Sequence, residues 1–253
     1  MLDGYEKEVF TGALTSGEKV SHDLYTRGQG PVVLIIQELP GIGQETLRLA
    51  DLFVDKSYSV ALPHLFGPLG RTSMLGNLAR VFCMRREFHL LLKNGSSPIV
   101  GWLKALCQTL RTRSGQDGVA VIGMCLTGNF AMSLMADDAV LAGVASQPAM
   151  PFFSQGALHM SDDEMASVRE RLDQVGPMMA LRFEDDRLCT ATKFEAIDRG
   201  LNQDGHRVRQ RVLPGKGHSV LTKDFVDEAG HPTRKAFDDV VAYFDGAFGI
   251  KRP

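Results

Sequence analysis

The sequence predicts an α/β fold with a mostly parallel central sheet and helices on both faces of that sheet. Short apolar runs alternate with stretches of helical periodicity over most of the 253 residues. The runs at 31–36 and 119–122 are apolar without alternation, which is typical of strands buried on both faces. The chain has no repeat, linker or low-complexity tract. We therefore expect residues 1–253 to form a single domain.

Each element is predicted from its own local pattern. Helices are predicted where apolar residues recur every three or four positions, and strands where apolar runs are bounded by Gly or Pro. In chain order, we expect a hairpin at 5–27 with its turn at 15–17, a strand at 31–36, a helix at 45–56, a strand at 58–62 that ends at Pro63, a loop and then a helix at 78–92, a helix at 98–110, a strand at 119–122 with a helix after it, a strand at 140–145, a helix at 161–174, a strand at 178–183, a helix at 190–203, a strand at 208–213 and a last helix from Pro232.

Two helix boundaries carry specific signals. Residues 161–164 read Ser-Asp-Asp-Glu, a capping box that opens a helix, and Gly176 with Pro177 follows the end of that helix. His231 directly precedes Pro232, so we interpret it as a residue of a helix start.

The composition excludes several classes of function. The net charge of −2 gives no electrostatic basis for binding nucleic acid or an anionic membrane. No apolar run approaches the roughly 20 residues that a membrane span needs, and residues 1–10 lack the apolar core of a signal peptide. The four cysteines show neither a C-x-x-C pair nor zinc spacing. We therefore expect a cytoplasmic protein without a metal site.

One strand-turn-helix stretch is typical of a catalytic nucleophile. The run 119–122 leads into G-x-C-x-x-G, and apolar residues then recur at helical spacing. This pattern puts Cys125 where an α/β-hydrolase keeps its nucleophile. Such a turn strains the backbone and needs small neighbours; Gly123 is present, but Thr127 replaces the usual second glycine and Gly128 follows it. A buried structural cysteine is the alternative interpretation.

A thiol nucleophile needs a base for its proton. In this fold class the order along the chain is nucleophile, acid, histidine. Of the seven histidines, His218 fits best, because it lies in a glycine-rich loop after the strand 208–213. A solvated loop histidine is the alternative. His206 precedes the same strand and lies at its wrong end, and His159 is a weaker candidate from the insertion between strands.

The acid of the site is expected directly after the strand 178–183. Glu184, Asp185 and Asp186 all follow that strand. Asp186 opens a D-x-x-C sequence, the form usual at this position, so we assign the acid to Asp186 with Asp185 as the alternative. A solvated acidic turn before the next helix is the other interpretation.

Three further groups are candidates for the site. Glu38 follows a fully apolar strand and is expected to face the cleft at its carboxyl end. The backbone N–H groups of Leu39 and Leu126 are expected to form an oxyanion hole. Arg80 and Arg85, in the predicted helix 78–92, are candidates for binding an anionic substrate group, with a solvated basic face as the equal alternative.

Together these motifs resemble the dienelactone hydrolase family, a branch of the α/β-hydrolases. The resemblance spans residues 31–245 and rests on Q-E-x-x-G at 37–41, G-x-C-x-x-G at 123–128, D-x-x-C at 186–189 and P-G-x-x-H at 214–218. It implies a Cys–His–Asp triad that hydrolyses a lactone or ester without a cofactor. It also implies that Glu38 controls the proton of the thiol.

Three departures from the family pattern bear on the substrate. Thr127 replaces a glycine, the segment 147–175 is long, and Thr222 with Lys223 stands where family members place an arginine that holds a substrate carboxylate. We therefore expect a small-molecule ester or lactone other than dienelactone, acted on by a monomer or homodimer. The alternatives are an acyl transferase or thioesterase on the same fold, or a non-catalytic binding protein.

Overall fold

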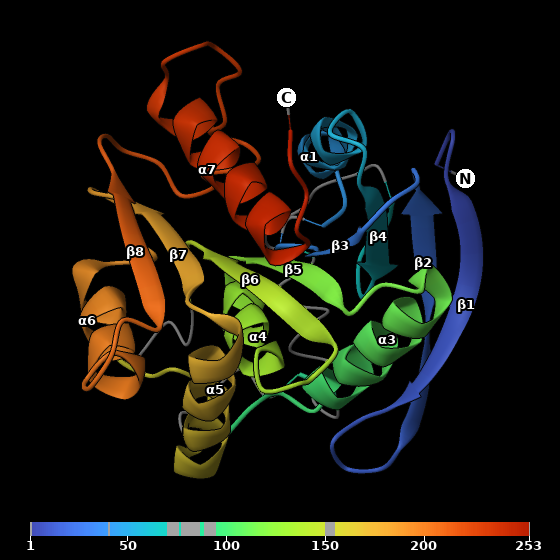
Figure 1. Cartoon of the computed structure of the whole chain (residues 1–253), viewed down its shortest axis with the longest axis horizontal. Coiled ribbons are helices and arrows are strands. Elements are labelled where there is room, and N and C mark those ends of the chain that lie inside the picture. Colours follow the sequence, from blue (N-terminus) through green and yellow to red (C-terminus); the bar gives the residue numbers. More distant parts are fainter. Residues whose placement is uncertain are drawn as a thin grey trace.

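The computed structural model describes residues 2–39, 41–69, 76, 87–88, 95–149 and 155–252. Figure 1 shows a twisted sheet with helices packed against both of its faces. The strands are β1 (Glu6–Ala13), β2 (Lys19–Arg27), β3 (Val32–Ile36), β4 (Ser59–His64), β5 (Val119–Met124), β6 (Val140–Ser146), β7 (Met178–Phe183) and β8 (Val208–Leu213). The helices are α1 (Gln44–Val54), α3 (Ile99–Ser114), α4 (Leu126–Leu134), α5 (Asp162–Val175), α6 (Ala191–Leu201) and α7 (Pro232–Ala247).

The sheet has the strand order β1-β2-β4-β3-β5-β6-β7-β8. β2 pairs antiparallel with β1 and with β4, and the other neighbouring pairs are parallel. The predicted α/β class with a mostly parallel sheet is confirmed. Parallel strands end at the same edge of a sheet, so the loops after β3, β5, β7 and β8 meet there.

The continuous apolar strands are explained by two buried clusters, one on each face of the sheet. Along β3, Val32, Leu34 and Ile36 belong to one cluster, whereas Val33 and Ile35 belong to the other. The first cluster packs against α3, α4, α5 and α6, and the second against α1 and α7. Because successive side chains of a strand point to opposite faces, a strand covered on both sides needs apolar residues at every position.

The described elements follow the predicted ranges closely, with one correction. Pro63 does not end its strand: β4 continues through Pro63 to His64. β4 pairs with β3 only through Ala61, whereas its pairing with β2 runs to His64. At Pro63 the strand therefore has a partner on one side only, where a residue without an N–H is tolerated.

The boundary signals are also confirmed. The Ser161 side chain accepts from the Glu164 backbone N–H while the Glu164 side chain accepts from the Ser161 N–H, so the capping box is complete. His231 is the N-cap of α7, with Pro232 at the first helical position. Of the predicted helix 78–92, the structure describes only residues 87–88, which form a turn and an irregular position rather than helix. Among the helices that the structure describes, none is long and apolar enough to cross a membrane.

Candidate active site

The turn between β5 and α4 holds Cys125 in a strained conformation. Its backbone has φ of 56° and ψ of −119°, a combination that non-glycine residues adopt only when the surroundings impose it, at a cost of about 1–3 kcal/mol. Here the Cys125 N–H donates to the Ser146 carbonyl at 3.1 Å, and the Cys125 carbonyl accepts from the N–H groups of Gly128 at 3.2 Å and Ala149 at 3.0 Å. The predicted strand–turn–helix arrangement is therefore present.

The two glycines around this turn are required by close backbone approaches. A Cβ on Gly123 would lie 2.0 Å from the Thr127 carbonyl oxygen, and one on Gly128 would lie 2.9 Å from Pro148 Cα. Thr127 itself has a different role, because its hydroxyl donates to the Ile36 carbonyl at 3.1 Å and accepts from the backbone N–H at 124 at 2.9 Å. The threonine that departs from the family pattern thus ties the turn to the end of β3.

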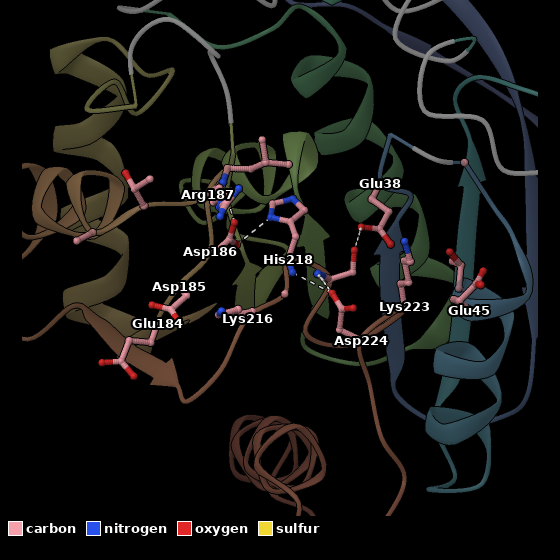
Figure 2. A pocket seen from close by; sticks show the side chains of 17 residues that line it. Glu38, Glu45, Glu184, Asp185, Asp186, Arg187, Lys216, His218, Lys223 and Asp224 are labelled. Atoms are coloured by element: carbon pink, nitrogen blue, oxygen red, sulfur yellow. Dashed lines mark hydrogen bonds and ion pairs between the residues drawn. The ribbon is translucent and has the colours of Figure 1, made fainter.

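His218 and Asp186 meet across the carboxyl ends of β7 and β8. His218 Nδ1 lies 2.8 Å from Asp186 Oδ2, and Figure 2 marks this hydrogen bond with a dashed line. The other oxygen of Asp186 accepts from the backbone N–H groups of Leu188 at 2.8 Å and Cys189 at 3.0 Å. The alternative acid, Asp185, is exposed and points away from His218. The carboxylate of Asp186 is therefore held in place and orients the imidazole ring.

The loop that carries His218 is fixed by a second carboxylate. Asp224 Oδ2 accepts from the backbone N–H groups of His218 and Ser219, both at 2.9 Å. Sequence reasoning missed Asp224. The sequence does show an acidic residue a few positions after the glycine-rich turn, and the side chain of such a residue commonly accepts hydrogen bonds from nearby backbone N–H groups.

The imidazole of His218 holds its proton strongly. Burial is the largest single influence and lowers its pKa, but the hydrogen bond to Asp186 and the interaction with the Cys125 side chain together outweigh it and raise the pKa to about 10. His218 Nε2 is buried and has no hydrogen-bond partner in the described part of the chain. The ring is thus able to give a proton to a group that arrives beside Cys125.

Glu38 lies at the same edge of the sheet and is 4% exposed. Its carboxylate accepts from the Thr222 hydroxyl at 2.6 Å and from the Ser219 hydroxyl at 3.1 Å. Burial raises the pKa of Glu38, against the smaller lowering influences of these hydroxyls and of His218. Thr222, one of the two residues that stand at the position of the family's arginine, thus binds Glu38 through a neutral hydroxyl, as Ser219 does.

The two expected oxyanion donors are both buried at this edge. Leu39 and Leu126 are each 1% exposed, and neither N–H donates a hydrogen bond within the described ranges. Leu126 is the first residue of α4, where backbone N–H groups are free and the helix dipole favours negative charge. The bond between Thr127 and Ile36 joins the two chain segments that carry these N–H groups.

A cavity of about 1300 Å³ opens beside the His218–Asp186 pair. Glu38, Asp186 and His218 line it, whereas Cys125 is 3% exposed and is not part of its described wall. The wall also contains charged side chains that sequence reasoning did not assign to the site, among them Glu45, Arg187, Lys216 and Lys223. The predicted substrate-binding residues Arg80 and Arg85 lie outside the described residues. Within the described ranges, no cluster of His, Cys, Asp or Glu is arranged to hold a metal ion.

Solved structures of hydrolases have the same fold. An esterase from an Arctic intertidal metagenomic library shares 14% identity with a TM-score of 0.63, over 98% of this chain and 96% of its own. A Klebsiella pneumoniae protein described as a dienelactone hydrolase shares 14% identity with a TM-score of 0.62, over 94% and 98%. A puromycin hydrolase shares 17% identity with a TM-score of 0.60; the alignment covers 98% of this chain and 40% of the puromycin hydrolase.

The comparison of sequences gives the family. No curated protein matches the chain. The model of the dienelactone hydrolase family matches residues 22–248, most of the chain. The protein therefore belongs to the dienelactone hydrolase family and is a hydrolase of carboxylic esters or lactones.

Proposed function

We propose that the protein cleaves its ester or lactone through Cys125 as nucleophile, with His218 as proton carrier and Asp186 as the group that orients His218. The observation that carries this proposal is the 2.8 Å hydrogen bond between His218 and Asp186, formed beside the strained turn of Cys125. A nucleophile, a base within reach and a third group that orients the base are the arrangement that covalent acyl transfer needs.

The chemistry proceeds in two halves. The Cys125 sulfur attacks the acyl carbon, and the carbonyl electron pair moves onto oxygen, where the N–H groups of Leu39 and Leu126 stabilise it. The tetrahedral adduct collapses, the C–O bond to the alcohol breaks, and His218 Nε2 protonates the departing alkoxide. A water then gives its proton to His218 and attacks the thioester carbon, the C–S bond breaks to release the carboxylic acid, and Glu38 returns the thiol proton to the sulfur.

Glu38 is proposed to accept the proton of the Cys125 thiol once substrate is bound. Burial raises the pKa of Glu38, which makes its carboxylate a stronger proton acceptor than an exposed one. The hydroxyls of Ser219 and Thr222 are neutral, so the Glu38 carboxylate breaks two hydrogen bonds but no ion pair when it moves away from these two residues. Substrate entering the cavity that Glu38 lines is the event that displaces it.

Replacing Glu38 by Gln is expected to lower turnover and raise stability. The proton acceptor is lost, which costs roughly 100-fold in kcat by the usual range for acid–base groups. The pKa of Glu38 is higher in the folded protein than its ordinary value of 4.5. The stability that this difference contributes is therefore fully present below pH 4.5 and is lost as the pH rises through the pKa of the folded protein. Glu38→Gln should therefore gain in Tm over the native protein more at pH 8 than at pH 5.

The matched control is Glu45→Gln, on the wall of the same cavity but partly exposed. A pH-independent Tm difference for Glu38→Gln, or the same pH dependence in both variants, would show that ionisation of the buried Glu38 does not lower the stability of the fold.

The reaction class is tested by product analysis. The protein is incubated with p-nitrophenyl acetate, a γ-lactone and an acyl thioester, each with and without a large excess of a primary alcohol. We expect the free acid from the ester and the lactone under both conditions, because water resolves the acyl-enzyme. Accumulation of the new ester of the added alcohol would identify an acyl transferase instead, and preference for the thioester alone would identify a thioesterase.

A further inference from the structure

A buried lysine lies beneath the turn that carries Cys125 and has no part in the mechanism above. Lys193, near the start of α6, is 1% exposed. Its ammonium group donates to Asn129 Oδ1 at 3.2 Å and to the carbonyl of Ala157. Burial lowers its pKa to about 8, so the group carries its charge at neutral pH. Because a buried charge is costly, its hydrogen bonds must offset that cost, and the bond to the Asn129 side chain is one of them.

Asn129 connects this ammonium group to the backbone of the turn. Its side chain is 1% exposed, and its Nδ2 donates to the Leu126 carbonyl at 3.1 Å and to the Ala149 carbonyl at 2.9 Å. Ala149 in turn donates its N–H to the Cys125 carbonyl at 3.0 Å. A continuous path of hydrogen bonds thus runs from Lys193 through Asn129 and Ala149 to Cys125.

The end of this path determines where the Leu126 N–H points. The Cys125 carbonyl and the Leu126 N–H belong to one planar peptide unit, in which the two bonds point in opposite directions. Holding the carbonyl of Cys125 on one side therefore aims the N–H of Leu126 to the other side. The bond from Asn129 to the Leu126 carbonyl fixes the next peptide unit as well.

We propose that Lys193 and Asn129 are positioning residues for the oxyanion hole, which hold the Leu126 N–H in the direction that the tetrahedral adduct requires. This inference rests on the proposed Cys125 mechanism. An oxyanion donor acts mainly on the transition state, so the loss of its positioning lowers kcat and leaves KM nearly unchanged. Alkylation of Cys125 by iodoacetamide forms no oxyanion, so its rate does not depend on this donor.

Two variants break the path at different points. Lys193→Met keeps the long apolar stem and removes the ammonium group. Asn129→Asp keeps an acceptor for Lys193 but removes the donor to the carbonyls of Leu126 and Ala149. Ile197→Ala is the matched control, because Ile197 lies on the same helix and is fully buried. The substitution weakens the packing of α6 and removes no side-chain hydrogen bond.

The experiment measures kcat and KM for p-nitrophenyl acetate and the iodoacetamide labelling rate of Cys125 in each protein. We expect both path variants to lose about 10- to 100-fold in kcat, part of the 100- to 1,000-fold that a whole oxyanion donor supplies, with KM and labelling within threefold of the native protein. Ile197→Ala should have a lower Tm and kcat within threefold of the native value.

Three outcomes would overturn the inference, and they differ in what else they affect. A kcat within twofold of native in Asn129→Asp would remove the path from catalysis. Equal losses of labelling and kcat would show a general distortion of the Cys125 turn rather than of the donor. Absence of turnover in the native protein would overturn the proposed function, and the inference with it.

Discussion

Cys125→Ala is expected to abolish ester hydrolysis, with a loss of roughly 100,000-fold or more in kcat, because it removes the proposed nucleophile. The fold should persist, since only a sulfur atom is lost and alanine can occupy the same backbone conformation as cysteine. Turnover of p-nitrophenyl acetate measures the first effect and the Tm measures the second.

Cys107→Ala is the control for this variant. Cys107 is fully buried in α3, on the face of the sheet that packs against α3 to α6, and it takes no part in the site. Its replacement should change kcat by less than threefold. Hydrolysis by Cys125→Ala within twofold of the native protein would remove Cys125 from the mechanism.

Asp186→Asn is expected to lower kcat by roughly 1,000- to 10,000-fold, as the loss of the orienting carboxylate does in other triads. The amide still has an oxygen for the N–H groups of Leu188 and Cys189, so the local turn should survive. What is lost is the acceptor that holds His218 Nδ1–H and stabilises the imidazolium. Asp185→Asn, one position away and exposed, should leave kcat within threefold of native.

The same variant has a pH signature. The pKa of His218 is raised from 6.5 to about 10, partly by Asp186. A group whose pKa is raised in the folded state stabilises the fold fully below its ordinary value and loses this contribution as the pH rises through the raised value. The Tm difference between the native protein and Asp186→Asn should therefore be largest near pH 6 and shrink toward pH 10. A difference that grows with pH would contradict the pairing.

The parts of the structure that local sequence determines were predictable. β5, the turn at Cys125 and α4 follow from an apolar run, a glycine and helical periodicity, all within a few residues of one another. The pairing of Asp186 rather than Asp185 with His218 follows from the D-x-x-C pattern, in which the carboxylate turns back to accept from the backbone at 188 and 189. Each of these patterns spans only a few consecutive residues, so it can be recognised without knowledge of long-range contacts.

The remaining features depend on partners far apart in the chain. The sequence predicts that Pro63 ends its strand, but β4 pairs with β2 alone at that point, and this one-sided pairing tolerates a proline. The hydroxyl of Thr222 binds Glu38, and Thr127 binds the end of β3; neither contact has a local pattern. Lys193 lies in the amphipathic pattern of α6, where a lysine predicts an exposed position, yet it is buried against Asn129.

The most direct test of the central claim is to trap the acyl-enzyme. The native protein is mixed with a slowly hydrolysed p-nitrophenyl ester, quenched in acid within the first turnover, digested and analysed by mass spectrometry. The mechanism predicts the mass of the acyl group on the peptide that contains Cys125, bound as a thioester that hydroxylamine removes. Stoichiometric acylation of a different side chain, such as the Ser219 hydroxyl beside Glu38, would contradict it.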